Sequence, residues 1–94
     1  PSSCKWLFTA VQGNRLVFRI NTFDVFPSIF CYRDLLEVLD GELRYAAVML
    51  AACGTREAGE TIRMSTDKAL VNFQAVTVGR DAQGFDFDVW SEQY

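Results

Sequence analysis

Residues 16–41 read LVFRINTFDVFPSIFCYRDLLEVLDG, and this stretch decides the fold. At its start Leu16, Phe18 and Ile20 occupy every second position, so their side chains share one face of an extended chain. Residues 34–39 are a second short apolar segment, which is closed by the turn-forming pair Asp40-Gly41. The stretch therefore predicts two β-strands.

The rest of the chain follows the same period of two. Residues 4–10 form an earlier strand, in which Trp6 and Phe8 mark the face that we expect to point into the core. A turn at residues 12–14 separates this strand from the stretch above. We expect that strand to run antiparallel to residues 16–21. Further alternating segments lie at residues 60–65, 69–75 and 85–89. Short strands separated by turn residues predict an all-β fold, an antiparallel β-sandwich.

Residues 42–52 fit two structures. Leu43, Ala46, Ala47 and Leu50 would form one stripe of a helix. The alternative is an irregular connection followed by a short strand that leads into Cys53.

Composition limits the classes of protein to consider. The chain has 94 residues with 50% hydrophobic and 14% aromatic content, which is typical of one globular domain and not of a disordered segment. No apolar run approaches the roughly 18 residues of a membrane span. The net charge is −3 with scattered basic residues, so nucleic acid is not an expected partner. The start at Pro1, without Met or signal peptide, suggests a processed or excised piece.

Histidine is absent, which removes the usual general base and the commonest zinc ligand. We expect no cofactor, no metal and no catalysis, and the least favoured alternative is a hydrolase that uses Asp34 with another acid. The three cysteines allow two interpretations. They are either buried thiols, or one disulfide with one cysteine left over.

Six short motifs follow one another along nearly the whole chain. They are Cys4-Lys5-Trp6, a strand ending in Phe23-Asp24, Cys31-Tyr32-Arg33-Asp34, Leu36-Glu37-Val38-Leu39-Asp40-Gly41, Cys53-Gly54 and Gly84-Phe85. In this order they resemble a CUB domain, an extracellular β-sandwich module. The resemblance implies a CUB-like jelly roll over residues 1–94 whose first strands are missing or atypical. For residues 42–52 it implies the irregular connection and short strand, which is the structure we expect. It also implies a location outside the cell, in a secreted protein or a receptor ectodomain.

The resemblance assigns roles to the cysteines and to a metal site. Cys31 and Cys53 match a disulfide of the family, whereas Cys4 matches a cysteine whose partner lies further upstream, so it is either unpaired or bonded outside the chain. Many CUB domains bind calcium, and the matching ligand positions here are Phe26, Asp34 and Val76. Only Asp34 has a carboxylate, so we expect the calcium site to be lost, with Phe26 and Val76 close together.

The apolar loop before Asp34 is the candidate binding surface. Phe30, Tyr32 and Arg33 are the residues we expect to contact a protein partner, which is another domain or another chain. The alternative for this loop is that some of its apolar side chains fold inward and fill the space of the lost ion. The function implied by the resemblance is protein–protein interaction through end loops. The first alternative is a carbohydrate-binding module, so a glycan is a second possible ligand. An uncovered sheet edge would also permit dimerisation.

Overall fold

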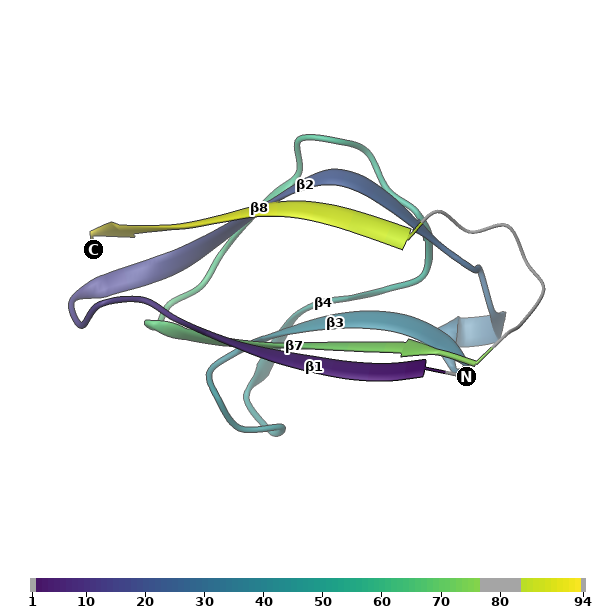
Figure 1. Ribbon diagram of the computed structural model, residues 1–94, viewed down its shortest axis with the longest axis horizontal. Coiled ribbons are helices and arrows are strands. Elements are labelled where there is room, and N and C mark those ends of the chain that lie inside the picture. Colours follow the sequence, from purple (N-terminus) through teal and green to yellow (C-terminus); the bar gives the residue numbers. More distant parts are fainter. Residues whose placement is uncertain (1, 77–83, 94) are drawn as a thin grey trace.

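The computed structural model describes residues 2–76 and 84–93. Its strands form two antiparallel sheets that face each other (Figure 1), which confirms the predicted β-sandwich. Sheet A has the strand order β1-β7-β3-β4, with β1 (Ser2–Thr9), β7 (Lys68–Ala75), β3 (Asp34–Asp40) and β4 (Ala47–Ala52). In sheet B the long β2 (Asn14–Val25) pairs with β8 (Gly84–Gln93) along one edge and with β5 (Gly54–Thr55) and β6 (Thr61–Arg63) along the other.

The hydrophobic core lies between the two sheets and follows the alternation of the sequence. In β2 the buried side chains include Phe18 and Ile20, and in β3 they include Leu36 and Val38. Successive side chains of a strand point to opposite faces, so one set from each strand is removed from water. The same cluster also contains Leu16, Phe23, Val25, Leu50, Ala52, Ile62, Met64, Ala69 and Val71.

The strands β1 and β2 are consecutive in the chain but belong to different sheets. β1 pairs with β7, whereas β2 pairs with β8, β5 and β6. The turn before Asn14, whose N–H donates to the Val11 carbonyl at 3.0 Å, therefore joins the two layers of the sandwich rather than a hydrogen-bonded hairpin. The rings of Phe8 and Phe18 meet edge to face across the core, with centroids 5.4 Å apart. These two strands are therefore linked by side-chain packing, and not by backbone hydrogen bonds between them.

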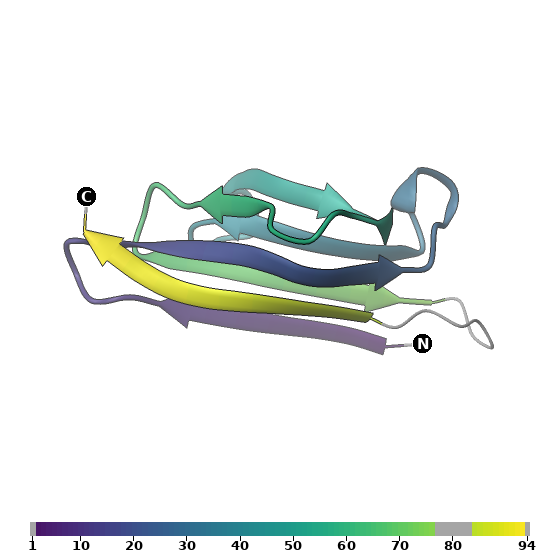
Figure 2. The same cartoon turned by 90° about the horizontal axis from the view of Figure 1, so that it is seen from above.

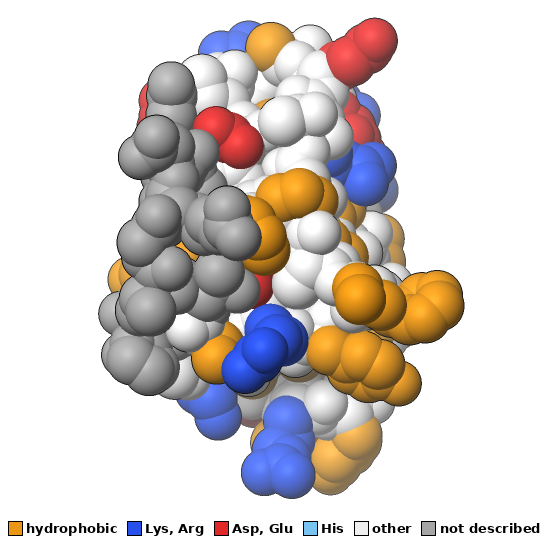
Figure 3. Space-filling model, turned by 90° about the vertical axis from the view of Figure 1, so that its right-hand side faces the viewer, with side chains coloured by type: hydrophobic (Ala, Val, Ile, Leu, Met, Phe, Trp, Pro, Cys, Tyr) orange, Lys and Arg blue, Asp and Glu red, His pale blue; other side chains and the backbone are white. Residues whose placement is uncertain are grey.

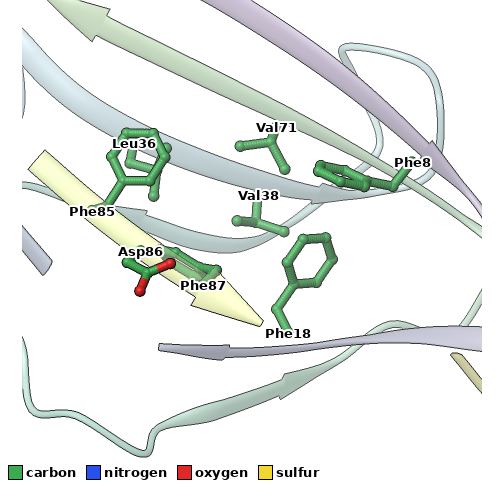
Figure 4. A pocket seen from close by; sticks show the side chains of 8 residues that line it. All are labelled: Phe8, Phe18, Leu36, Val38, Val71, Phe85, Asp86 and Phe87. Carbon is green, nitrogen blue, oxygen red and sulfur yellow. The ribbon is translucent and has the colours of Figure 1, made fainter. Parts of the chain in front are cut away.

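One side of the sandwich is bordered by β1 and β8, the edge strands of the two sheets (Figure 2). Trp6 points towards β8, where its ring contacts Phe85, yet it remains 40% exposed because nothing in the described part of the chain covers this side. We had expected Trp6 to mark the core side of its strand, and it is only partly buried there. A cavity of about 160 Å³ opens between the sheets at this side (Figure 4), lined by Phe8, Phe18, Leu36, Val38, Val71, Phe85, Asp86 and Phe87.

The ambiguous segment 42–52 forms a connection and a strand, as expected, and not a helix. β4 pairs with β3 and buries Leu50 and Ala52. Gly41 begins the connection with φ +143°, and a Cβ at this position would lie 3.1 Å from the Cβ of Ala46. The turn therefore favours glycine because a side chain would meet both backbone strain and close contact.

Candidate functional site

A disulfide joins Cys31 to Cys53, as the family resemblance implied, with a Cα–Cα distance of 5.5 Å. Cys31 is the last residue of a single 3-10 turn, η1 (Ile29–Cys31), and Cys53 directly precedes β5. The bond therefore attaches η1 to the end of the sandwich. Closing a loop of 22 residues stabilises a folded chain by about 3 kcal/mol in the chain-entropy model.

The backbone of η1 is strained. Phe30 and Cys31 have φ values of +53° and +55°, a left-handed conformation that costs a non-glycine residue about 1 kcal/mol or more. Ser28 holds the turn in place, because its Oγ accepts hydrogen bonds from the backbone N–H groups of Arg33 and Asp34, at 3.3 and 3.0 Å. The strain is therefore offset by a covalent bond and by local hydrogen bonds.

Gln74 of β7 fixes the other side of the turn. Its Nε2 donates to the carbonyl oxygens of Tyr32 and Arg33, both at 3.1 Å. The segment that follows η1 is therefore attached to sheet A as well as to β5.

The side chains on this fixed turn point into solvent. Ile29 is 78% exposed, Phe30 87% and Tyr32 78%, and we call these three residues the η1 knob. Arg33, beside the knob, is also exposed. Figure 3 looks onto this end of the molecule, where hydrophobic side chains gather on one side with basic side chains near them. The candidate residues Phe30, Tyr32 and Arg33 thus lie together. Ile29 was not among the predicted binding residues, but it belongs to the same cluster because it lies in the same turn.

The two rings of the knob do not form a flat platform. Phe30 and Tyr32 meet edge to face, with centroids 6.3 Å apart and planes at 78°. Such a pair has a convex shape that suits insertion into a concave apolar surface. It is less suited to stacking against the face of a sugar ring.

The three positions matched to calcium ligands lie at the same end of the sandwich. Asp34 is 2% exposed, and its Oδ1 accepts a hydrogen bond from the Val76 N–H at 3.0 Å. Phe26 is half-buried at the end of β2. Within residues 2–76 and 84–93 no three His, Cys, Asp or Glu side chains gather as a metal ion would require.

The remaining cysteine, Cys4, is an exposed thiol on β1, and no other cysteine of the described residues is bonded to it. β1 is an edge strand, so this thiol lies at the same uncovered side of the sandwich as Trp6. As for membrane insertion, the described part of the chain contains no helix with the length and apolar character needed to cross a bilayer.

Basic residues that are dispersed in the sequence come together on the outer face of sheet B. Arg15 and Arg63 both approach Glu92 Oε1, at 3.4 and 3.0 Å, and Arg19 pairs with Asp88. The hydrogen bonds from Arg19 and then from Asn21 lower the pKa of Asp88 below its ordinary value. Sequence reasoning missed these pairs because their members are 29 to 77 positions apart and meet only through strand register.

Comparison with known proteins identifies the family. The model of the CUB domain matches residues 1–88. The chain is 26% identical to the dorsal-ventral patterning protein tolloid of Drosophila melanogaster over 84 residues, which are 89% of this chain and 8% of that protein. It is 31% identical to mouse tolloid-like protein 1 over 67 residues, which are 71% of this chain and 6% of the relative. The chain thus spans less than a tenth of the length of either relative.

Among solved structures, the CUB1-EGF-CUB2 domain of human MASP-1/3 has a similar fold. The TM-score is 0.84 at 19% sequence identity, with 99% of this chain and 36% of that chain covered. The CUB domains of tolloid and MASP proteins are non-catalytic protein-interaction modules of extracellular proteins. The match over residues 1–88, together with the disulfide and the sandwich, shows that the chain belongs to the CUB domain family.

Proposed function

We propose that this CUB domain binds a protein partner through the η1 knob, as an interaction module of a larger secreted protein or receptor ectodomain. The observation that carries the proposal is the exposure of Ile29, Phe30 and Tyr32 on one turn that is fixed by a disulfide. Large apolar side chains are costly to leave in water, and aromatic residues are enriched where binding energy is concentrated.

The turn favours binding because it is already ordered. The Cys31–Cys53 bond, the Ser28 hydroxyl and the Gln74 amide hold its backbone before any partner arrives. A partner then need not offset the entropy of ordering a loop, which is one of the main costs of association. The knob would act as a preorganised anchor.

Arg33 adds a polar contact at the rim of the knob. Its guanidinium is exposed, so it can pair with a carboxylate on the partner and orient the complex, as rim charges do at many interfaces. The partner that fits has a concave apolar surface with an acidic group beside it. A stable interface buries about 800 Å² on each side, so the partner must also contact surfaces next to the knob.

The experiment is a binding screen of the domain against a panel of recombinant extracellular proteins, followed by variants measured on each hit. Phe30→Ser and Tyr32→Ser should each weaken binding about tenfold or more, as expected for anchor residues. Tyr45→Ser is the matched control, because Tyr45 is an exposed aromatic residue (83%) on the connection before β4, outside the knob. A hit that depends on Tyr45 and not on Phe30 or Tyr32 would overturn the proposal.

A further inference from the structure

The outer face of sheet A contains a polar hollow of about 200 Å³, close to the segment that follows η1. Two rows of residues in neighbouring strands line it. One row runs Lys5, Asn72, Glu37 across β1, β7 and β3, and the next row runs Ser3, Gln74, Leu35. We call this feature the sheet A hollow. It is a different surface from the η1 knob.

Asn72, in the middle of the first row, has a hydrogen-bond acceptor without a donor. Its Nδ2 donates to Glu37 Oε1 at 3.2 Å, and because a carboxylate can only accept, this contact fixes which end of the amide faces Glu37. The Asn72 Oδ1 is buried and has no hydrogen-bond partner among the described residues. A buried acceptor in this state is costly, so the site favours a ligand that supplies an O–H or N–H group.

Gln74, in the second row, has its amide oriented in a similar way. Its Nε2 is occupied by the carbonyl oxygens of Tyr32 and Arg33. Its Oε1 is therefore the end of the amide that remains for a ligand. The hollow therefore offers three hydrogen-bond acceptors to a ligand: the amide oxygens of Asn72 and Gln74 and the carboxylate of Glu37.

The charges of the hollow favour a neutral ligand. Lys5 and Glu37 line it with one charge of each sign, and the Glu37 carboxylate accepts a hydrogen bond from Asn72. An ammonium ligand would be attracted by Glu37 and repelled by Lys5, and an anion the reverse, so the two charges largely cancel and neither sign of charge gains. A hydroxyl group both donates and accepts, so a ligand with several hydroxyls can satisfy the amide oxygens, the carboxylate and the ammonium group together.

We propose that the sheet A hollow binds one residue of a neutral glycan. Its volume is below the roughly 300–1,000 Å³ of a pocket for a drug-sized ligand, which limits it to a small group such as a single sugar ring. Leu35 supplies an apolar surface for the C–H groups of that ring. The proposal is separate from binding through the η1 knob, because none of the three knob side chains lines the hollow, although Gln74 lines the hollow and also holds the segment that follows η1.

The test is an NMR titration of the ¹⁵N-labelled protein with a panel of neutral methyl glycosides, which follows the side-chain amides of Asn72 and Gln74. n-Propylammonium chloride and sodium propionate serve as charged controls. At least one glycoside should shift both amide signals along a saturable curve, and the charged compounds should not. Saturable binding of n-propylammonium alone would overturn the proposal in favour of a cation site, and the absence of saturable shifts with any glycoside would also overturn it.

Two variants make the test specific to this hollow. Asn72→Leu removes the acceptor and should weaken glycoside binding about tenfold. It removes the hydrogen bond from Asn72 Nδ2 to Glu37 but also removes a buried acceptor that has no partner, and because these two effects oppose each other the melting temperature should change little. Lys5→Ala should weaken binding of a neutral glycoside but strengthen binding of a cation, so the sign of the change distinguishes the two ligand classes. Asn14→Leu, on sheet B, is the control and should bind like wild type. If Asn72→Leu also binds like wild type, the ligand lies elsewhere and the assignment is overturned.

Discussion

The carboxylate of Asp34 accepts a hydrogen bond from the backbone N–H of Val76, with Oδ1 and N 3.0 Å apart. Asp34 opens β3, and Val76 directly follows β7, the strand that pairs with it. The contact therefore joins two strands at the end of sheet A that carries η1. From the family resemblance we matched Asp34 and Val76 to calcium-ligand positions, and in this structure a backbone amide donates to the acid.

The first prediction concerns calcium. Phe26 and Val76 have hydrocarbon side chains, so the site retains only one of the oxygen ligands that this cation requires. A bound ion present at ten times its Kd would stabilise the fold by about 1.4 kcal/mol and raise the melting temperature of a domain of this size by several degrees. We expect no rise between EDTA and millimolar calcium. A clear calcium-dependent increase would mean that the ligand positions were matched wrongly.

The second prediction tests the role of Asp34. Asp34→Ala should lower the free energy of unfolding by about 1–3 kcal/mol, because it leaves the Val76 N–H without its acceptor in a region where Asp34 itself is buried. Asp34→Asn retains an acceptor oxygen and should cost less. The measurement is urea unfolding of the two variants. Equal stability of wild type and Asp34→Ala would contradict the structural role.

The third prediction concerns the disulfide. Digestion without reduction should yield one cross-linked peptide pair that contains Cys31 and Cys53, found by mass spectrometry. The double variant Cys31→Ser, Cys53→Ser should lose about 3 kcal/mol of stability, because its unfolded chain is no longer constrained by the closed loop. Cys4→Ser is the control and should unfold like wild type, since Cys4 is exposed and is not bonded to either of these cysteines. Recovery of Cys31 in alkylated form without reduction would refute the bridge.

The fourth prediction separates two neighbouring phenylalanines. We predict that Phe26 packs near Val76 and fills the space of the lost ion, since protein interiors tolerate few voids. Phe26 is half-buried, so Phe26→Ala should cost about 2 kcal/mol, less than the 3–5 kcal/mol of a fully buried phenylalanine. Phe30→Ala should leave stability within about 0.5 kcal/mol of wild type, because Phe30 is 87% exposed. A larger loss of stability for Phe30→Ala than for Phe26→Ala would reverse the two roles.

The fifth prediction concerns the titration of Asp88. Its pKa is lowered by hydrogen bonds from Arg19 and Asn21, so its charged form is favoured in the folded state. The contribution to stability is therefore present above the unfolded pKa of the group and is lost as the pH falls through its folded pKa. Arg19→Gln should raise the Asp88 pKa, as measured from its carboxyl ¹³C shift in an NMR pH titration. An unchanged pKa in this variant would show that Arg19 is not the main cause.

Local sequence patterns predicted most of the strands correctly, because alternation of apolar and polar residues reflects which face of a strand is buried. Phe18 and Ile20 in β2 and Leu36 and Val38 in β3 are buried as this alternation predicts. The segment 42–52 was ambiguous because a period of 3.6 and a period of 2 both fitted its alanines and leucines. Pairing of β4 with β3 decided in favour of the strand, and this pairing is a tertiary contact.

The candidate binding residues were predictable in part. Phe30 and Tyr32 stood out in the sequence because they are aromatic and close to Cys31, but their exposure follows from the left-handed backbone of the turn, which the disulfide and Ser28 hold in place. The sheet A hollow was not predictable. Lys5, Asn72 and Glu37 are far apart in the chain and become neighbours only through the register of β1, β7 and β3.

The sequence by itself determined the β-sandwich class and the family, since alternation and motif order are properties of the linear chain. The pairing of Cys31 with Cys53 was implied by the family resemblance, and the structure contains it. Only the tertiary structure decided that β1 and β2 lie in opposite sheets and that Trp6 remains partly exposed beside an open edge. It also decided that Arg15 and Arg63 share Glu92, and that Asn72 is left with an unpaired oxygen. The physical reason is that strand pairing depends on which apolar faces meet across the core, and this choice sets the register that brings distant polar groups together.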